Sequence, residues 1–207
     1  MKVLLINGSP REHGCTYTAL SEIAETLEKN GVTAEIFHIG KKPIAGCMAC
    51  NSCASTGRCV IDDEVNKLAA RLDEFGGIVL GSPVYYAAAS GQLCAFLDRL
   101  FYFNSAKMAG KLGAAVVSCR RGGAEAAWDR LNKYFGISSM FIVGSQYWNQ
   151  IHGSTPEQVK KDAEGLQTMR TLAQNMAWML KNIEAGRKAG IALPKYEPRI
   201  STNFIRE

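Results

Sequence analysis

The chain has 207 residues, of which 47% are hydrophobic and 21% are charged, with a net charge of +5. This length and composition predict one globular domain with a single core. The sequence shows no membrane-spanning stretch and no signal peptide, and its positive charge is too diffuse to predict nucleic-acid binding. We therefore expect a cytoplasmic protein that binds neither a membrane nor a nucleic acid. Its seven cysteines indicate metal binding, redox chemistry or plain burial in that compartment, and not a disulfide scaffold.

Predicted strands and helices alternate along the chain. The strands are expected at residues 2–7, 32–38, 76–80, 112–117 and 140–143. Apolar residues at helical spacing occupy the segments between them and the segment after the last one. Asp62 is expected to cap a helix that includes Leu72. A capping box at residues 155–158 is expected to begin the long final helix, with Pro156 at its first position.

Five strands alternating with helices predict an α/β fold with three layers, in which a doubly wound parallel sheet has the order 2-1-3-4-5. Ligands of such sheets bind at the carboxyl ends of the strands. Three segments follow strands there and are rich in Gly, Ser, Pro, Tyr and Arg, namely residues 8–18, 82–92 and 118–123. The predicted strand order places these three loops side by side, so we expect one binding site among them.

The first of these loops has the composition of a phosphate site. Gly8 allows the turn, while Ser9, Thr16 and Thr18 supply hydroxyl groups and Arg11 supplies a positive charge. The dinucleotide motif G-x-G-x-x-G is absent, and no Lys-Ser or Lys-Thr pair completes a nucleoside-triphosphate loop. A terminal monophosphate, such as that of flavin mononucleotide (FMN), is the expected ligand.

The other two loops suit a flavin ring. Tyr85 and Tyr86 offer aromatic walls, and Pro83 restricts the backbone. Arg120 and Arg121 offer positive charge for a reduced flavin or for a nicotinamide dinucleotide phosphate. Taken singly, each of these residues is equally compatible with ordinary surface packing.

A fourth motif lies in a loop at residues 43–60. Cys47, Cys50, Cys53 and Cys59 follow the spacing C-x2-C-x2-C-x5-C. Four thiolates this close could bind a [4Fe–4S] cluster or a tetrahedral zinc ion. Free redox-active thiols are the third alternative. The other three cysteines, Cys15, Cys94 and Cys119, are expected to be small packing residues or loop residues.

At this point the sequence resembles the NADPH-dependent FMN reductase and iron–sulfur flavoprotein family. The resemblance covers about residues 1–145 and rests on segments 8–11, 47–63, 82–86 and 96–99. It implies a flavodoxin-like fold, an FMN cofactor and a homodimer or homotetramer. It also implies a set of FMN-binding residues: Ser9, Arg11, Cys15, Thr16, Tyr17, Pro83, Val84, Tyr85, Tyr86, Ser118 and Gly122. Cys94 stands where many relatives have a lysine.

The expected function is that of an FMN-dependent oxidoreductase. NADPH or NADH would reduce the flavin at N5, and the flavin would reduce a small acceptor such as a quinone, a free flavin, or a nitro or azo compound. No side chain is expected to act as a catalytic acid or base, because the cofactor carries the chemistry. One alternative is an electron carrier with FMN and a [4Fe–4S] cluster that takes electrons from ferredoxin. A zinc-stabilised flavin-binding or redox-sensing module is another.

The end of the chain has two expected parts. Residues 1–184 are expected to form the FMN-binding domain, and residues 185–207 a tail that packs on the core or on a partner subunit. The tail carries an apolar segment at Asn203, Phe204 and Ile205. The polar and aromatic stretch at 146–153 is expected to be a loop, which either covers a partner's flavin, shapes an acceptor pocket or is a surface loop anchored by Trp148.

Overall fold

The protein has a parallel sheet at its centre in this computed structural model, which describes residues 1–198, 200 and 202. The main strands are β1 (Lys2–Asn7), β2 (Thr33–His38), β3 (Gly77–Tyr85), β5 (Leu112–Cys119) and β6 (Phe141–Ile142). They pair in the order β2-β1-β3-β5-β6. This is the predicted 2-1-3-4-5 order, so the fold class is confirmed.

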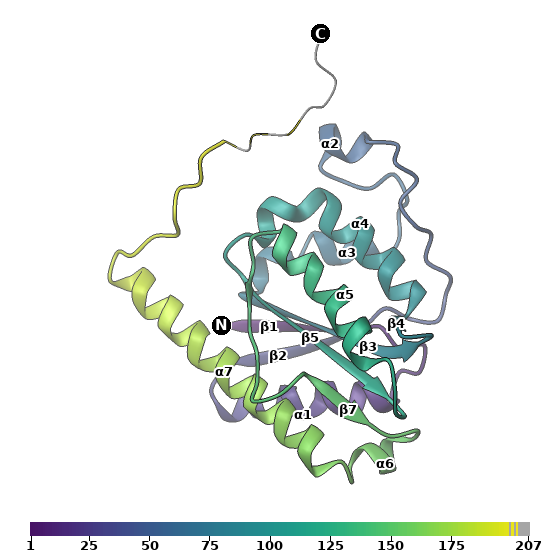
Figure 1. Ribbon diagram of the computed structural model, residues 1–207. Helices are drawn as coiled ribbons and strands as arrows, with labels where there is room; N and C mark the ends of the chain where they lie inside the picture. Colours follow the sequence, from purple (N-terminus) through teal and green to yellow (C-terminus); the bar gives the residue numbers. More distant parts are fainter. Residues whose placement is uncertain (199, 201, 203–207) are drawn as a thin grey trace.

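Helices cover both faces of the sheet (Figure 1). On one face lie α1 (Cys15–Lys29), α6 (Pro156–Val159) and α7 (Ala163–Lys188), and on the other α3 (Glu64–Ala69), α4 (Gly91–Met108) and α5 (Ala124–Ile137). Side chains of β1 alternate between the two cores, since Val3 and Leu5 pack with α1 and α7 whereas Leu4 and Ile6 pack against the other layer. This alternation produces the three-layer arrangement.

The third strand extends further than predicted. β3 continues through Ser82 and Pro83 to Tyr85, and then pairs with the antiparallel β4 (Ala88–Ala89). The predicted end at residue 80 and the loop at 82–86 were therefore wrong. Pro83 is tolerated because the pairing of β3 with β1 stops at Gly81 and its pairing with β4 begins at Val84, so the side that its missing N–H would face has no strand partner.

The fifth strand is split into two short pieces. β6 covers only Phe141–Ile142, and β7 (Gln150–His152) pairs with the carboxyl end of β5. The predicted loop at 146–153 thus contains a strand. The chain leaves the sheet edge after β6 and returns to it, and Val117 donates its N–H to the Asn149 carbonyl at 3.0 Å where it returns.

Two predicted helix starts are also corrected. Asp63, not Asp62, caps α3 by accepting the Val65 N–H, and Leu72 belongs to the separate 3-10 helix η1 (Leu72–Glu74). The capping box at 155–158 begins only the short α6. Asp162 caps α7 by accepting the Gly165 N–H.

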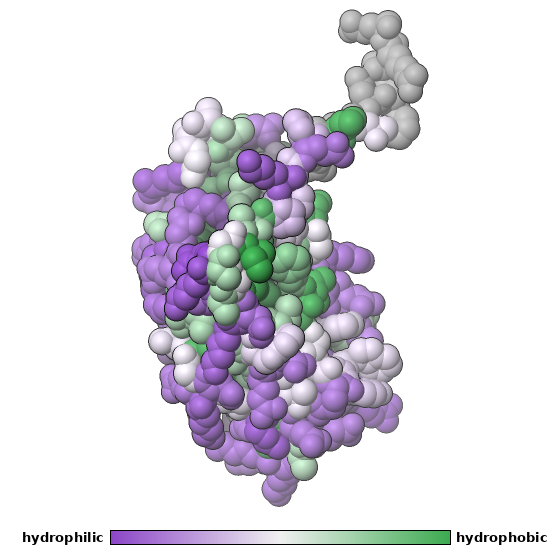
Figure 2. Space-filling model, turned by 90° about the vertical axis from the view of Figure 1, so that its left-hand side faces the viewer, coloured by the Kyte–Doolittle hydropathy of each residue, from purple (hydrophilic) through white to green (hydrophobic). Residues whose placement is uncertain are grey.

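The final helix runs past the predicted domain boundary to Lys188. Beyond it, Leu193 lies so close to Gly110 that a Cβ at that glycine would be 2.5 Å from a Leu193 methyl group. Gly110, Phe141, Ile183 and Leu193 are among the residues lining an apolar groove of about 690 Å³, and Figure 2 shows apolar residues gathered on the corresponding face. The predicted apolar segment at 203–205 lies outside the described residues. Within the described part of the chain, no helix has the length and apolar character to span a membrane.

Candidate functional site

The three predicted loops meet at the carboxyl edge of the sheet, which we define as residues 8–18, 82–92 and 118–123. Gly8 donates its N–H to the Gly81 carbonyl at 2.8 Å, and the Ser90 hydroxyl donates to the Gly8 carbonyl at 2.8 Å. The hydroxyl groups of Thr16 and Ser118 are 2.9 Å apart. Direct hydrogen bonds therefore join the first loop to the other two.

Buried polar side chains shape the first loop. The Asn7 side-chain amide donates to the Glu12 carbonyl at 2.9 Å and accepts the Ser9 N–H at 3.1 Å, while the Ser9 hydroxyl accepts the Arg11 N–H. His38, at the end of β2, donates from Nε2 to the Ser9 carbonyl at 2.8 Å. The sequence analysis assigned no role to Asn7 or His38, although an asparagine and a histidine ending two adjacent strands were a usable signal.

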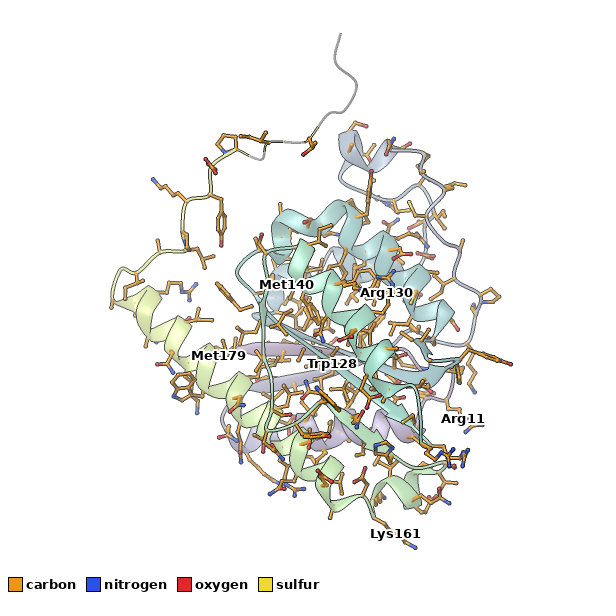
Figure 3. The ribbon with its side chains drawn as sticks, in the orientation of Figure 1. Arg11, Trp128, Arg130, Met140, Lys161 and Met179 are labelled. Carbon is orange, nitrogen blue, oxygen red and sulfur yellow. The ribbon has the colours of Figure 1, made fainter. Side chains whose placement is uncertain are left out.

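The N-terminus of α1 presents donors to this loop. Gly14, the residue before α1, has no side chain that could cap the helix. The first turn of α1 holds no acidic residue. The N–H groups of Cys15, Thr16 and Tyr17 belong to the first turn, where backbone donors lack helical partners and favour an anion. Figure 3 shows Arg11 at the rim beside them, pointing outward. The backbone donors of this turn can hold a phosphate, and Arg11 adds positive charge at the rim.

The second loop is a tight hairpin between β3 and β4. Tyr86 and Ala87 form its turn with φ of +50° and +57°, which is the geometry of a two-residue type I′ turn. Tyr86 is fully exposed and Tyr85 is half-exposed. The hairpin contacts the third loop, because a Cβ on Gly123 would be 2.8 Å from the Ala87 Cα. Pro83, Val84 and the two tyrosines thus form a wall beside the loop that carries Gly122.

The remaining residues of the third loop differ in their solvent exposure. Ser118 and Cys119 are buried at the end of β5, whereas Arg120 and Arg121 are exposed. The Cys119 Sγ atom lies 3.4 Å from Nδ1 of His152. The exposed side chains of the two arginines give this edge positive charge.

Burial is the main influence on the pKa of the three cysteines that were predicted to pack. It raises the pKa of the Cys15, Cys94 and Cys119 thiols. A raised pKa keeps a thiol protonated, which disfavours metal binding and nucleophilic reactivity. Cys15 donates weakly to the Gly153 carbonyl, with a distance of 3.7 Å, and so connects the first loop to the segment after β7.

The other cysteines lie in the loop at residues 43–60, which we call the cysteine loop. It extends past α3 and α4 and carries the short helix α2 (Ser52–Thr56) (Figure 1). Cys47, Cys50, Cys53 and Cys59 line one small space of about 20 Å³, together with Met48, Asn51, Val60, Ile61 and Tyr102. Left-handed backbone at Ala49 and Asn51, with φ of +53° and +57°, turns the chain between successive cysteines.

Two of these cysteines have hydrogen-bond partners for their sulfur atoms. The backbone and side chain of Ser52 lower the pKa of Cys50 by hydrogen bonding to its sulfur. Arg99 donates from Nε to the Cys59 Sγ at 3.3 Å. Among the described residues, however, no three Cys, His, Asp or Glu side chains are arranged as ligands of one metal ion. A cubane cluster takes one thiolate on each of four irons, so its ligands are further apart than those of a single zinc ion.

Comparisons with known proteins agree with this geometry. A sequence model of the family described as NADPH-dependent FMN reductase matches residues 1–154. An iron–sulfur flavoprotein from Methanocaldococcus jannaschii is 33% identical over 192 residues, which cover 89% of this chain and all of that protein. An iron–sulfur flavoprotein from Methanosarcina thermophila is 28% identical over 90% of this chain and 99% of its own.

A solved structure supports the fold independently. A flavodoxin from the domain Archaea superimposes with a TM-score of 0.60 at 18% identity, covering 87% of this chain and 99% of its own. At that identity the similarity concerns the fold, which is flavodoxin-like. The extent of the family match and the full-length similarity to the curated relatives show that this chain belongs to the NADPH-dependent FMN reductase family and is a relative of the iron–sulfur flavoproteins.

Proposed function

We propose that the protein is an FMN-dependent oxidoreductase whose cysteine loop holds a [4Fe–4S] cluster. The observation that carries the flavin assignment is the joining of three polar loops around the uncapped N-terminus of α1. This site offers donors for one phosphate and an adjacent aromatic wall. Family membership agrees with this ligand.

Different residues of the carboxyl edge would bind different parts of FMN. Ser9, Arg11, Cys15, Thr16 and Tyr17 would hold the FMN phosphate. The hairpin residues Pro83, Val84, Tyr85 and Tyr86 would support the ring on one side, with Ser118 and Gly122 on the other. When bound, FMN supplies the capacity to accept electrons from one partner and donate them to another.

The protein's own contribution is orientation and charge. Buried Thr16 and Ser118 bond to each other and keep the phosphate loop against the end of β5. Exposed Arg120 and Arg121 would attract an anionic partner such as a nicotinamide dinucleotide. We propose NADPH or NADH as the reductant on the basis of the family, and a quinone, flavin, nitro or azo compound as the acceptor.

A second electron source is supported by a separate observation. Four cysteines line one space, and both curated relatives described above are iron–sulfur flavoproteins matched over nearly their whole length. If Cys47, Cys50, Cys53 and Cys59 hold the cluster, a reduced ferredoxin becomes the natural donor, because the cluster supplies a one-electron entry point that is separate from the flavin.

Anaerobic purification tests both assignments on one sample. We expect a flavin spectrum, a broad shoulder near about 400 nm and about four irons per chain. Reduction of the bound flavin should then be timed with NADPH, NADH and reduced ferredoxin in turn. FMN without iron would remove the cluster and leave the nicotinamide-linked reductase. Stoichiometric zinc with no turnover would favour the structural module, and absence of FMN after reconstitution would contradict the main proposal.

A further inference from the structure

A buried arginine lies beneath the cysteine loop. The Arg99 side chain, on α4, is 1% exposed. It pairs with Asp63 through two bonds, from Nη1 at 2.6 Å and from Nη2 at 2.9 Å. Its other donors reach the Cys59 sulfur at 3.3 Å, the Ile61 carbonyl at 2.9 Å and the Ala45 carbonyl at 3.3 Å.

Stability alone does not account for this arginine. Burying an ion pair costs desolvation free energy, and apolar side chains of similar volume often serve a core as well or better. The neighbouring positions Phe96 and Leu100 on the same helix are indeed apolar core residues. An arginine at this position is explained by its several N–H donors, which bond to residues at both ends of the cysteine loop at once.

α4 connects the two regions that the proposed function requires. Its first residue follows Ser90, which binds the Gly8 carbonyl at the carboxyl edge. Further along, Gln92 donates to the Gly40 and Lys42 carbonyls, and the Tyr102 hydroxyl donates to Asn51 at 3.0 Å. Residues 92, 99 and 102 are spaced to share one face of the helix. This face therefore contacts the cysteine loop through Arg99 and Tyr102, and the segment that leads into the loop through Gln92.

We propose that Arg99 is a positioning residue of the cysteine loop, which fixes Cys59 and, through the Nε–H···Sγ bond, raises the reduction potential of the cluster held there. This inference rests on the proposed function. Asp63 balances the charge of the arginine, so the N–H directed at sulfur is the remaining influence. A hydrogen bond to a cluster sulfur stabilises the more negative, reduced state.

The test compares Arg99→Lys with Arg58→Lys. Lysine keeps the charge, but one ammonium group cannot bond to both carboxylate oxygens of Asp63 and also donate to the Cys59 sulfur. Arg58 is a matched control, since it precedes Cys59 in the chain but makes an exposed pair with Asp62. In the cluster-loaded protein, we expect Arg99→Lys to lower the midpoint potential by about 59 mV, a tenfold weaker stabilisation of the reduced state, and to alter the Fe–S stretching frequencies in resonance Raman spectra. Arg58→Lys should leave both unchanged.

A second measurement follows the positioning role. Hydrogen exchange of the backbone amides in residues 44–63 should be about tenfold faster in Arg99→Lys, because one of the bonds that hold the loop is lost. FMN content should remain that of the wild type. If Arg99→Lys fails to fold, the double variant Arg99→Met with Asp63→Asn removes the pair without leaving a buried charge, and asparagine still caps α3.

The outcomes are separable from failure of the proposed function. An unchanged midpoint potential in Arg99→Lys would overturn the inference, as would equal shifts in Arg99→Lys and Arg58→Lys. Loss of iron from Arg99→Lys with FMN retained would support it. If the wild type itself binds no iron, the cluster assignment fails, and unchanged amide exchange in Arg99→Lys would then overturn the positioning role as well.

Discussion

The carboxyl edge and the cysteine loop are built in opposite ways. At the carboxyl edge, Ser9, Thr16, Ser82 and Ser118 are buried, and their hydroxyl groups form hydrogen bonds within the loops or, for Thr16 and Ser118, between two loops. The cysteine loop has almost no buried residue of its own, and side chains of α3 and α4 hold it from below. The carboxyl edge is formed where the strands of the sheet end, whereas the cysteine loop depends on a few side chains from neighbouring helices. The two should therefore respond separately to mutation.

The largest expected effect is on the cysteine loop. Cys50→Ser should abolish cluster binding, because a serine oxygen is a poor replacement for thiolate on iron. FMN should be retained at wild-type stoichiometry, since the carboxyl edge contains none of these cysteines. Iron and flavin analysis of the same preparation provides the measurement. Loss of FMN together with iron would show that the loop also supports the flavin site and would break the comparison.

The matching change at the carboxyl edge is Arg11→Ala. A hydrogen bond to a charged group contributes about 1.5–3 kcal/mol, so the FMN dissociation constant should rise about 10- to 100-fold. Fluorescence titration of the apoprotein with FMN measures it. The control is Arg58→Ala, which removes an exposed cation from the other region and should leave the FMN affinity unchanged. Equal weakening by both variants would indicate a general charge effect.

A glycine substitution tests the packing between the hairpin and the third loop. Gly123 has φ of +84°, and an added Cβ would be 2.8 Å from the Ala87 Cα. Gly123→Ala should therefore lower the free energy of unfolding by about 1–2 kcal/mol from backbone strain alone, with further loss from displacement of the hairpin. Urea denaturation of the FMN-free protein measures this change.

Gly122→Ala is the control for that experiment. The position has open space around it, with nothing within 4 Å of an added Cβ. It should leave the free energy of unfolding nearly unchanged. Similar destabilisation by the two variants would mean that the contact with Ala87 contributes nothing.

The smallest expected effect concerns the elements that flank the cysteine loop. Glu35 on β2 accepts two bonds of 2.8 Å from Arg71, which follows α3. The Arg71 guanidinium holds the pKa of the Glu35 carboxyl at about 2, below its ordinary 4.5. Because the folded-state pKa is depressed, the stabilisation is present above the ordinary pKa and is lost as pH falls from there toward about 2.

Glu35→Gln should remove part of this acid sensitivity. The fall in Tm between about pH 5 and pH 2 should be smaller in this variant than in the wild type. Glu22→Gln serves as the control, because it breaks an exposed ion pair with Arg170 on the other face of the protein. An identical acid profile for wild type and Glu35→Gln would show that the ion pair with Arg71 does not contribute to the acid sensitivity of the fold.

The sequence was sufficient for the strand order and for the position of the carboxyl edge. Strand–helix alternation is a local, periodic signal, and the handedness of parallel connections leaves few topologies. The assignment of FMN-binding residues at this edge stays a prediction. The sequence did not reveal the contacts of Asn7 and His38 with the first loop, and that of His38 depends on the approach of β2. The errors occurred where local signals are weak. Pro83 suggested a loop although β1 had already ended beside it, and β7 is too short to show a period.

What the sequence determined by itself was the set of chemical groups: a loop of glycine, hydroxyl and arginine residues after the first strand, aromatic and cationic loops after two others, and four cysteines at close spacing. Only the tertiary structure decided that Thr16 meets Ser118, and that Arg99 lies beneath Cys59, which is forty residues away. The physical reason is the distance along the chain over which each kind of signal acts. Periodicity and motif spacing report on neighbours along the chain, whereas a buried guanidinium finds its sulfur and carboxylate partners only when packing brings a helix under a distant loop.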